Sequence, residues 1–263
     1  MNAYMHSYTN PSTQHVVALT AGGRFERELP EASARVGRGP LVWGRVEEIG
    51  SPAYWAAQSW MWELEEPEHY RLGKSLEEEV IACLLGGYGI PAEVGLAAYD
   101  RFRSVLSDDP ASLCAFDVTY ELLSRPLQMG GRSVKYRFAR QKAQYVAAAM
   151  SALPTIDRTA SDKDLRDALM TLPGIGPKTA SWIVRNWRGS DEVSILDIHI
   201  LRAGRDLEIF PRHWSVERHY GKLEQAYLDF ANAIEARASI LDSVMWMTMR
   251  ALPHALTRPS QSH

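Results

Sequence analysis

The stretch that most constrains the fold spans residues 165–205, where two amphipathic helical segments flank a glycine-rich turn. The turn reads LPGIGPK over residues 172–178. Its two glycines, Gly174 and Gly176, allow a tight bend whose backbone can approach a partner closely. Pro177 suits the first helical position, because its missing N–H would have had no intrahelical partner. The remaining free N–H groups and the positive helix end therefore predict an anion site, which for DNA would be a backbone phosphate.

Such a turn also occurs as plain structure, so the faces of the helix that follows it matter. Apolar residues at three- and four-residue spacing predict a core stripe: Ala180, Ile183, Val184 and Trp187. Lys178 lies off this stripe, and Trp182, four residues later, lies on the same side as Lys178. An amine beside an indole offers a nucleophile for a sugar and a flat surface for a flipped base. The structural alternative is a solvated lysine with a tryptophan packed against the neighbouring lobe.

Asp197 stands between an apolar run, Val193 to Leu196, and a helical segment that begins at Ile198. This position predicts a helix N-cap, which explains the residue structurally. A carboxylate held rigidly at a helix start also suits the stabilisation of positive charge on a sugar ring.

The chain is predicted to be mostly helical after residue 52, whereas the first fifty residues have a different composition. Those residues are rich in Gly, Pro, Ser and Thr and contain two β-like runs, His15–Thr20 and Leu41–Ile49. Ser75 with Glu78, and Ser161 with Asp164, are predicted to cap helices. The expected helices cover about 75–85, 91–106, a segment from 110, 138–152, 161–170, 178–187, 198–205, 216–236 and 239–251.

Charge and cysteine content narrow the classes of function. The net charge is −3, but residues 122–156 contain six Lys and Arg and no Asp or Glu, whereas residues 63–79 are strongly acidic. One face could therefore attract a polyanion, although a solvated basic helix is the alternative. Cys83 and Cys114 lie in apolar surroundings and are predicted to be buried and reduced. With no apolar run of membrane-spanning length and no secretion signal, the expected location is the cytoplasm.

The segments LPGIGPKTASWIV and ILDIHILR resemble the helix-hairpin-helix DNA glycosylases, and among them the 8-oxoguanine DNA glycosylase/AP lyases. In that motif an L-P-G-[VI]-G-x-K hairpin is followed, 19 residues after the lysine, by the aspartate of a D-x-H sequence. Lys178, Asp197 and His199 match it. A weaker similarity covers residues 137–142 and the pairs 241–242 and 245–246, which are similar to the compact prokaryotic and archaeal branch.

The resemblance implies a mainly α, two-lobed fold with its active site in the cleft and a small N-terminal β-element. We expect a tail and β-element over residues 1–50. Residues 51–87 with 191–263 would form a helical lobe from both chain ends, and residues 88–190 a central lobe with the hairpin 172–178. The partner implied is double-stranded DNA with a damaged base, bound by a monomer that is nucleoid-associated if bacterial.

The same resemblance assigns roles to individual residues. Lys178 would form a Schiff base with the sugar, assisted by Asp197, so that an oxidised purine, 8-oxoguanine first, is removed and the strand is cut. The phosphate contacts implied are Gly174, Gly176, His199 and Arg140, and the base pocket implied includes Trp246 and Asp242. Trp182 stands where other members have smaller residues, and we expect it to line the base pocket in this chain. The backbone carbonyls of Met170, Leu172 and Ile175 would hold Na⁺ or K⁺.

The sequence also departs from the family and leaves alternatives open. The four-cysteine iron–sulfur loop of some branches is absent, and no cofactor is expected for the chemistry. Tyr88, in a turn with three glycines, stands where members carry the residue that fills the gap left by the flipped base, but it could pack on its own loop. The alternatives are a glycosylase for another damaged base and a non-catalytic DNA-binding module. The β-element and the acidic stretch could also dock a protein partner.

Overall fold

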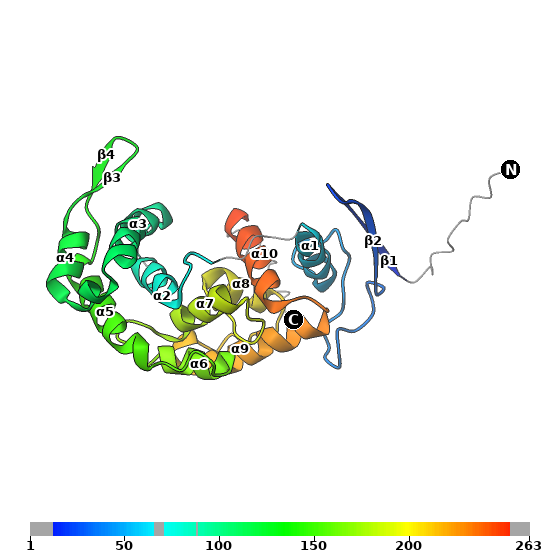
Figure 1. The fold of residues 1–263 in the computed structure, drawn as a ribbon. Helices are drawn as coiled ribbons and strands as arrows, with labels where there is room; N and C mark the ends of the chain where they lie inside the picture. The colour runs from blue at the N-terminus through cyan, green and yellow to red at the C-terminus, as the bar shows by residue number, and fades with distance from the viewer. Residues whose placement is uncertain (1–12, 66–70, 88, 253–263) are drawn as a thin grey trace. The chain divides into compact units, whose positions relative to one another are not determined.

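The structure is a computed structural model of the 263-residue chain that describes residues 13–65, 71–87 and 89–252. Across these residues the chain forms ten α-helices and four short strands, joined by turns that include two short 3-10 helices. The strands pair in two separate sheets, β1 with β2 and β3 with β4. The prediction of a mainly α fold with a small N-terminal β-element is confirmed (Figure 1).

The chain divides into two compact units. Unit 1 consists of residues 1–68 and 196–263, and unit 2 of residues 69–195. Residues 69–87 were expected in the lobe formed by the chain ends, whereas the division places them in unit 2. In the structure α2 (Leu76–Leu85) packs against α3 (Ala92–Asp108), α5 (Ala139–Ala152) and α7 (Pro177–Arg188), all within unit 2.

Unit 1 brings together helices from both ends of the chain: α1 (Pro52–Leu64), α8 (Ile198–Asp206), α9 (Val216–Ala233) and α10 (Ala238–Ala251). Helices α1, α8 and α9 each contact α10, around fully buried aromatic side chains that include Trp55 and Tyr227. Strands β1 (Gln14–Thr20) and β2 (Gly23–Leu29) form an antiparallel hairpin. Val16 and Leu29 belong to the same apolar core as the helices, so the β-element is anchored to them.

The predicted strand over Leu41–Ile49 is wrong. Within it, only Val42 forms a β-bridge, with Arg35, and turns follow. Trp43 is instead buried, and its carbonyl accepts a hydrogen bond from the N–H of Ala53 at 2.9 Å. The partner of β1 is β2, whose sequence GRFEREL is mostly exposed and therefore shows no alternation of apolar and polar residues.

Unit 2 contains the predicted hairpin between α6 (Asp162–Leu169) and α7, together with α4 (Phe116–Ser124) and the small sheet of β3 (Leu127–Met129) and β4 (Arg132–Val134). Helix α7 packs against α2 and α6. Its predicted core stripe is confirmed at three fully buried positions, Ala180, Ile183 and Val184. The fourth, Trp187, is half-buried beneath the guanidinium group of Arg71.

The predicted caps are confirmed, whereas the prediction for one cysteine is wrong. The hydroxyls of Ser75 and Ser161 accept hydrogen bonds from the N–H groups of Glu78 and Asp164, each at 3.2 Å. Cys83 is buried, but Cys114 is exposed, because it ends a 3-10 turn that buries Leu113 instead. None of the helices in the described ranges is long and apolar enough to span a bilayer.

Candidate active site

The turn between α6 and α7 is a compact hairpin whose geometry depends on Gly174. After α6, the N–H groups of Thr171 and Leu172 donate to Ala168 and Leu169, and Ile175 donates to the Leu172 carbonyl at 3.1 Å. Gly174 has φ +82°, and a Cβ atom there would overlap the ring of Tyr145. A left-handed backbone and the close approach of an aromatic ring therefore both require glycine at this position.

Gly176 plays a different part, as the N-cap residue of α7. Its φ of −91° is accessible to any residue, and a glycine has no side chain with which to cap the helix. No atom lies within 4 Å of the position that a Cβ would occupy, so the start of α7 is open. Pro177 follows at the first helical position as predicted. The free N–H groups of this 12-residue helix can thus reach an anion.

Lys178 lies in the first turn of α7 and is half-buried. Its amine forms no hydrogen bond or ion pair with any residue that the structure describes. Trp182, one helical turn later, is also half-buried and packs against the apolar core of unit 2. Its ring carbon Cη2 lies 3.5 Å from the position that a Cβ of Gly86 would occupy. The indole therefore adjoins the end of α2, while the amine beside it is uncommitted.

The end of α2 is held by two donors that the sequence analysis did not assign. The Lys142 amine donates to the carbonyls of Leu84 at 2.6 Å and Gly86 at 3.4 Å, and the Tyr136 hydroxyl donates to Leu85 at 2.7 Å. Helix ends leave such carbonyls without intrahelical partners. Burial lowers the pKa of the Lys142 amine. A lysine near the start of a predicted helix was the available sequence signal, but its partners lie more than 50 residues away.

Gly89, which follows the end of α2, lies beside exposed residues that precede or begin α5. A Cβ on Gly89 would lie 3.6 Å from both Arg137 and Phe138. Phe138 is 41% exposed and has φ +66°, which is rare for an aromatic residue. Arg140 is exposed, with its guanidinium carbon 5.4 Å from the centre of the Phe116 ring. Tyr88, the expected gap-filling residue, lies outside the described residues.

Asp197 caps α8 in unit 1, as predicted. Its Oδ1 atom accepts hydrogen bonds from the N–H groups of His199 at 2.8 Å and Ile200 at 2.9 Å. Within the described part of the chain, no hydrogen bond ends on Oδ2, and the residue is partly exposed. One carboxylate oxygen thus fixes the side chain, and the other remains available for a developing positive charge.

Two more of the expected site residues lie one turn apart on α10, in the same unit. Asp242 is buried, whereas Trp246 is 38% exposed. The indole of Trp246 stands edge-on to the ring of His199, with centroids 6.2 Å apart, and the guanidinium carbon of Arg250 lies 4.8 Å from its centre. His199 and Trp246 therefore connect α8 with α10 close to the Asp197 cap.

The backbone carbonyls expected to hold a monovalent cation lie around the hairpin. Leu172 already accepts the N–H of Ile175, and an oxygen of this kind has a second lone pair. No backbone hydrogen bond outside the helices ends on the carbonyls of Met170 or Ile175 in the described ranges. The donor set is therefore compatible with Na⁺ or K⁺. In the same ranges, no group of three or more His, Cys, Asp and Glu residues could hold a metal ion.

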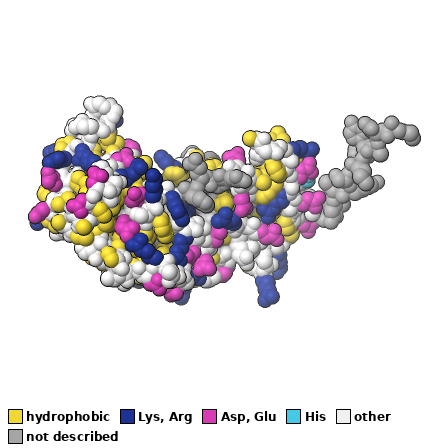
Figure 2. Space-filling model, viewed as in Figure 1, with side chains coloured by type: hydrophobic (Ala, Val, Ile, Leu, Met, Phe, Trp, Pro, Cys, Tyr) yellow, Lys and Arg dark blue, Asp and Glu magenta, His cyan; other side chains and the backbone are white. Residues whose placement is uncertain are grey.

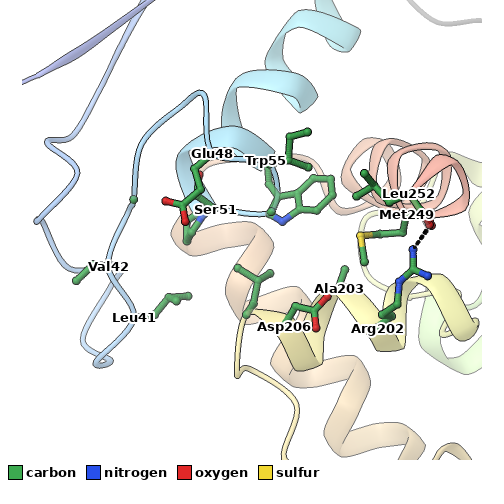
Figure 3. Close-up of a pocket in the computed structure, with 15 residues that line it drawn as sticks. Leu41, Val42, Glu48, Ser51, Trp55, Arg202, Ala203, Asp206, Met249 and Leu252 are labelled. Carbon is green, nitrogen blue, oxygen red and sulfur yellow. Dashed lines mark hydrogen bonds between the residues drawn. The ribbon is translucent and has the colours of Figure 1, made fainter. Parts of the chain in front are cut away.

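A pocket of about 180 Å³ in unit 1 lies apart from the expected site residues (Figure 3). Its walls come from the loop before α1, from the first residues of α1 and from the C-terminal parts of α8 and α10, including Leu41, Trp55, Asp206 and Met249. None of the residues assigned to catalysis, DNA or the base lines it. The Arg202 guanidinium closes one side by donating to the carbonyl of Met249.

Comparison with protein families shows what this hairpin and its flanking helices resemble. Residues 116–236 match the model of a family described as 8-oxoguanine DNA glycosylase. This region contains α4 to α9, the hairpin, Lys178 and Asp197. Over these residues the chain is similar to the 8-oxoguanine DNA glycosylases. The match confirms the resemblance found in the sequence.

Solved structures extend this likeness to more of the chain. The 8-oxoguanine DNA glycosylase of Methanocaldococcus jannaschii is 27% identical over 68% of this chain and 80% of its own, with a TM-score of 0.51. The glycosylase/lyase of that organism in complex with DNA containing 8-oxoguanine is 25% identical over 68% and 84%, with a TM-score of 0.50. The Thermotoga maritima 8-oxoguanine DNA glycosylase shares the fold, at 21% identity over 76% and 97%, with a TM-score of 0.55. A sequence search of characterised proteins gave no match.

Proposed function

We propose that this chain is a DNA base-excision repair glycosylase with AP lyase activity, and that 8-oxoguanine is its preferred lesion. One observation carries the proposal: a family-matched hairpin presents the half-buried, uncommitted amine of Lys178 in the first turn of the helix that follows it. The glycosylase/lyase of known structure that binds 8-oxoguanine DNA supports both the lesion and the lyase step for this chain.

The proposed chemistry divides between two residues. Asp197 stabilises the positive charge that develops on the sugar as the glycosidic bond lengthens, because its Oδ2 atom is left available when Oδ1 caps α8. The unprotonated amine of Lys178 attacks the anomeric carbon of the sugar and the base departs. The C1′–O4′ bond then opens, O4′ takes up a proton and a Schiff base forms between Lys178 and C1′. Removal of a proton from C2′ expels the 3′ phosphate by β-elimination, which cuts the strand.

The DNA contacts in this proposal come from the surfaces described above. The open start of α7 at Gly176 and the turn at Gly174 bind a phosphate through backbone N–H groups, and His199 and Arg140 bind others. Trp182, Trp246 and Asp242 receive the flipped base. A Na⁺ or K⁺ ion on the carbonyls of Met170, Leu172 and Ile175 would add positive charge beside that phosphate.

Borohydride trapping tests the proposal directly. The wild-type protein is incubated with a duplex containing 8-oxoguanine and sodium borohydride, which reduces a Schiff base to a stable protein–DNA adduct. We expect an adduct with the wild type and with Lys163→Gln, which removes an exposed lysine of the same unit, and none with Lys178→Gln. If the wild type gave neither an adduct nor base release, the proposal would be contradicted. If it nevertheless bound the duplex, the protein would be a non-catalytic DNA-binding module.

The lesion is tested with a panel of duplexes that differ in one damaged base. We expect the largest kcat/KM on 8-oxoguanine and smaller values on alkylated purines and oxidised pyrimidines. If another damaged base were released faster, the glycosylase activity would stand, but the assignment of 8-oxoguanine as the preferred lesion would be wrong.

A further inference from the structure

The β3–β4 hairpin of unit 2 is a feature that the proposed function does not use. Its strands are antiparallel, with Leu127 opposite Val134 and Met129 opposite Arg132. Gly130 and Gly131 form the two-residue turn, with φ +54° and +78°, as a tight right-twisted hairpin requires. Apart from their chain neighbours, no atom of the described residues lies within 4 Å of a Cβ built on either glycine, so the space in front of each position is open.

The base of this hairpin is firmly attached to the helices of its unit. Leu127 is buried, and Tyr136, which follows β4, is tied to the end of α2 through its hydroxyl. Arg101 on α3 donates to the backbone carbonyls of Leu122, Arg125 and Pro126, the residues that lead into β3. The hairpin therefore projects from unit 2 as a fixed element (Figure 1).

The two faces of the hairpin differ in character. Leu127, Met129, Val134 and Arg132 share one face, where the three apolar side chains pack against the core of unit 2 and Arg132 is exposed beside the tip. The opposite face presents Gln128 and Ser133, which are exposed and lie 3.5 Å apart between Nε2 and Oγ. Amide and hydroxyl groups of this kind are common ligands of phosphate oxygens in protein–DNA complexes.

The exposed charges at the tip of the hairpin and directly after β4 are positive and uncompensated. Arg132 and Lys135 are exposed and make no ion pair with any residue in the described ranges. No Asp or Glu occurs between residues 122 and 156, although the whole chain has a net charge of −3. On the face shown in Figure 2, the projecting hairpin carries no acidic side chain. An exposed positive charge kept clear of acids suits a polyanion.

We infer that the β3–β4 hairpin is a second duplex-binding element, in which Arg132 and Lys135, supported by Gln128 and Ser133, bind backbone phosphates of the DNA. The inference rests on the proposed function for the identity of the polyanion. These contacts involve phosphates alone, so they add affinity equally to damaged and undamaged duplex. The glycine tip lets the protein backbone approach the DNA without side chains in between.

The test measures how the Kd for DNA depends on salt concentration in the double variant Arg132→Ala/Lys135→Ala. The matched control is Lys74→Ala/Lys163→Ala, which removes two exposed lysines of the same unit that stand beside acidic residues. With undamaged and 8-oxoguanine duplexes alike, we expect the hairpin variant to raise Kd on the order of tenfold near 0.1 M salt. We also expect the slope of log Kd against log salt to fall by about 1.8, because each of the two lost phosphate contacts contributes about 0.9 to the slope.

The control variant is expected to keep the wild-type Kd and slope. The inference is overturned if the hairpin variant does the same, or if both variants lose affinity equally, which would be a general effect of charge. Circular dichroism of each variant checks the fold. The wild type could form no borohydride adduct while the hairpin variant still binds DNA more weakly than the wild type. That result would disprove the glycosylase proposal and leave the present inference standing.

Discussion

The side chains of Glu79 and Asn186 meet inside unit 2, where Oε1 of Glu79 accepts a hydrogen bond from Nδ2 of Asn186 at 2.8 Å. Glu79 is fully buried on α2, and its Oε2 atom also accepts the backbone N–H groups of Leu72 and Gly73. Asn186 is buried on α7. One carboxylate therefore joins three segments of the chain, among them the helix that carries Lys178.

Replacement of Glu79 by Gln should destabilise the protein. A glutamine amide has one accepting end, so its NH₂ group must face either the N–H groups of Leu72 and Gly73 or the amide of Asn186. We expect the free energy of unfolding, from urea denaturation near neutral pH, to fall by about 1–3 kcal/mol. Glu121→Gln, which breaks only an exposed pair with Arg125, should cost at most about 1 kcal/mol. Equal losses in the two variants would contradict the argument.

The same residue should make stability depend on pH. Burial raises the pKa of the Glu79 carboxyl above its ordinary value of 4.5, despite the opposing hydrogen bonds. The folded protein thus holds this proton more tightly than the unfolded chain does. The resulting stabilisation is complete below the ordinary pKa and is lost as the pH rises through the folded-state pKa. Above pH 4.5, the unfolding free energy of the wild type should decline more steeply with pH than that of Glu79→Gln; parallel curves would refute this.

The two glycines of the 172–178 hairpin should respond differently to alanine. Gly174→Ala forces a left-handed alanine into the ring of Tyr145, so we expect a loss of stability of about 1–3 kcal/mol and weaker DNA binding. Gly176→Ala meets no neighbouring atom and has an ordinary φ, so its thermal midpoint should stay near that of the wild type. Its Kd for duplex DNA should rise, because the added methyl group obstructs the approach of a phosphate to the start of α7. An unchanged Kd for Gly176→Ala would contradict the proposed phosphate contact at the start of α7.

Residues whose structure is set by near neighbours were predictable from the sequence. The caps at Ser75, Ser161 and Asp197 depend on bonds to atoms two or three residues away, and all three are present. The core face of α7 follows from helical periodicity within one segment. Motif spacing likewise sufficed to recognise the likeness to the glycosylases, because Lys178 and Asp197 lie on one continuous stretch of chain.

Features set by distant partners were not predictable. The run Leu41–Ile49 looks β-like in the sequence, but Trp43 is buried in the core of unit 1 and Gly44 adopts φ +66°. Strand β2 gives no pattern, because most of its side chains face solvent. The clamp of Lys142 on the end of α2 and the bond from Asn186 to Glu79 join residues more than 50 positions apart. Only the folded chain identifies such partners.

Asp197 combines a structural and a chemical part, and two substitutions should separate them. Asparagine keeps an oxygen that can accept the N–H groups of His199 and Ile200, so Asp197→Asn should leave the thermal midpoint almost unchanged. It removes the negative charge, and we expect the single-turnover rate of 8-oxoguanine release to fall by about 10²-fold or more. Asp197→Ala should lose the same activity and in addition about 1 kcal/mol of stability, because the cap is gone. If Asp197→Asn released the base at the wild-type rate, Asp197 would be a helix cap and nothing more.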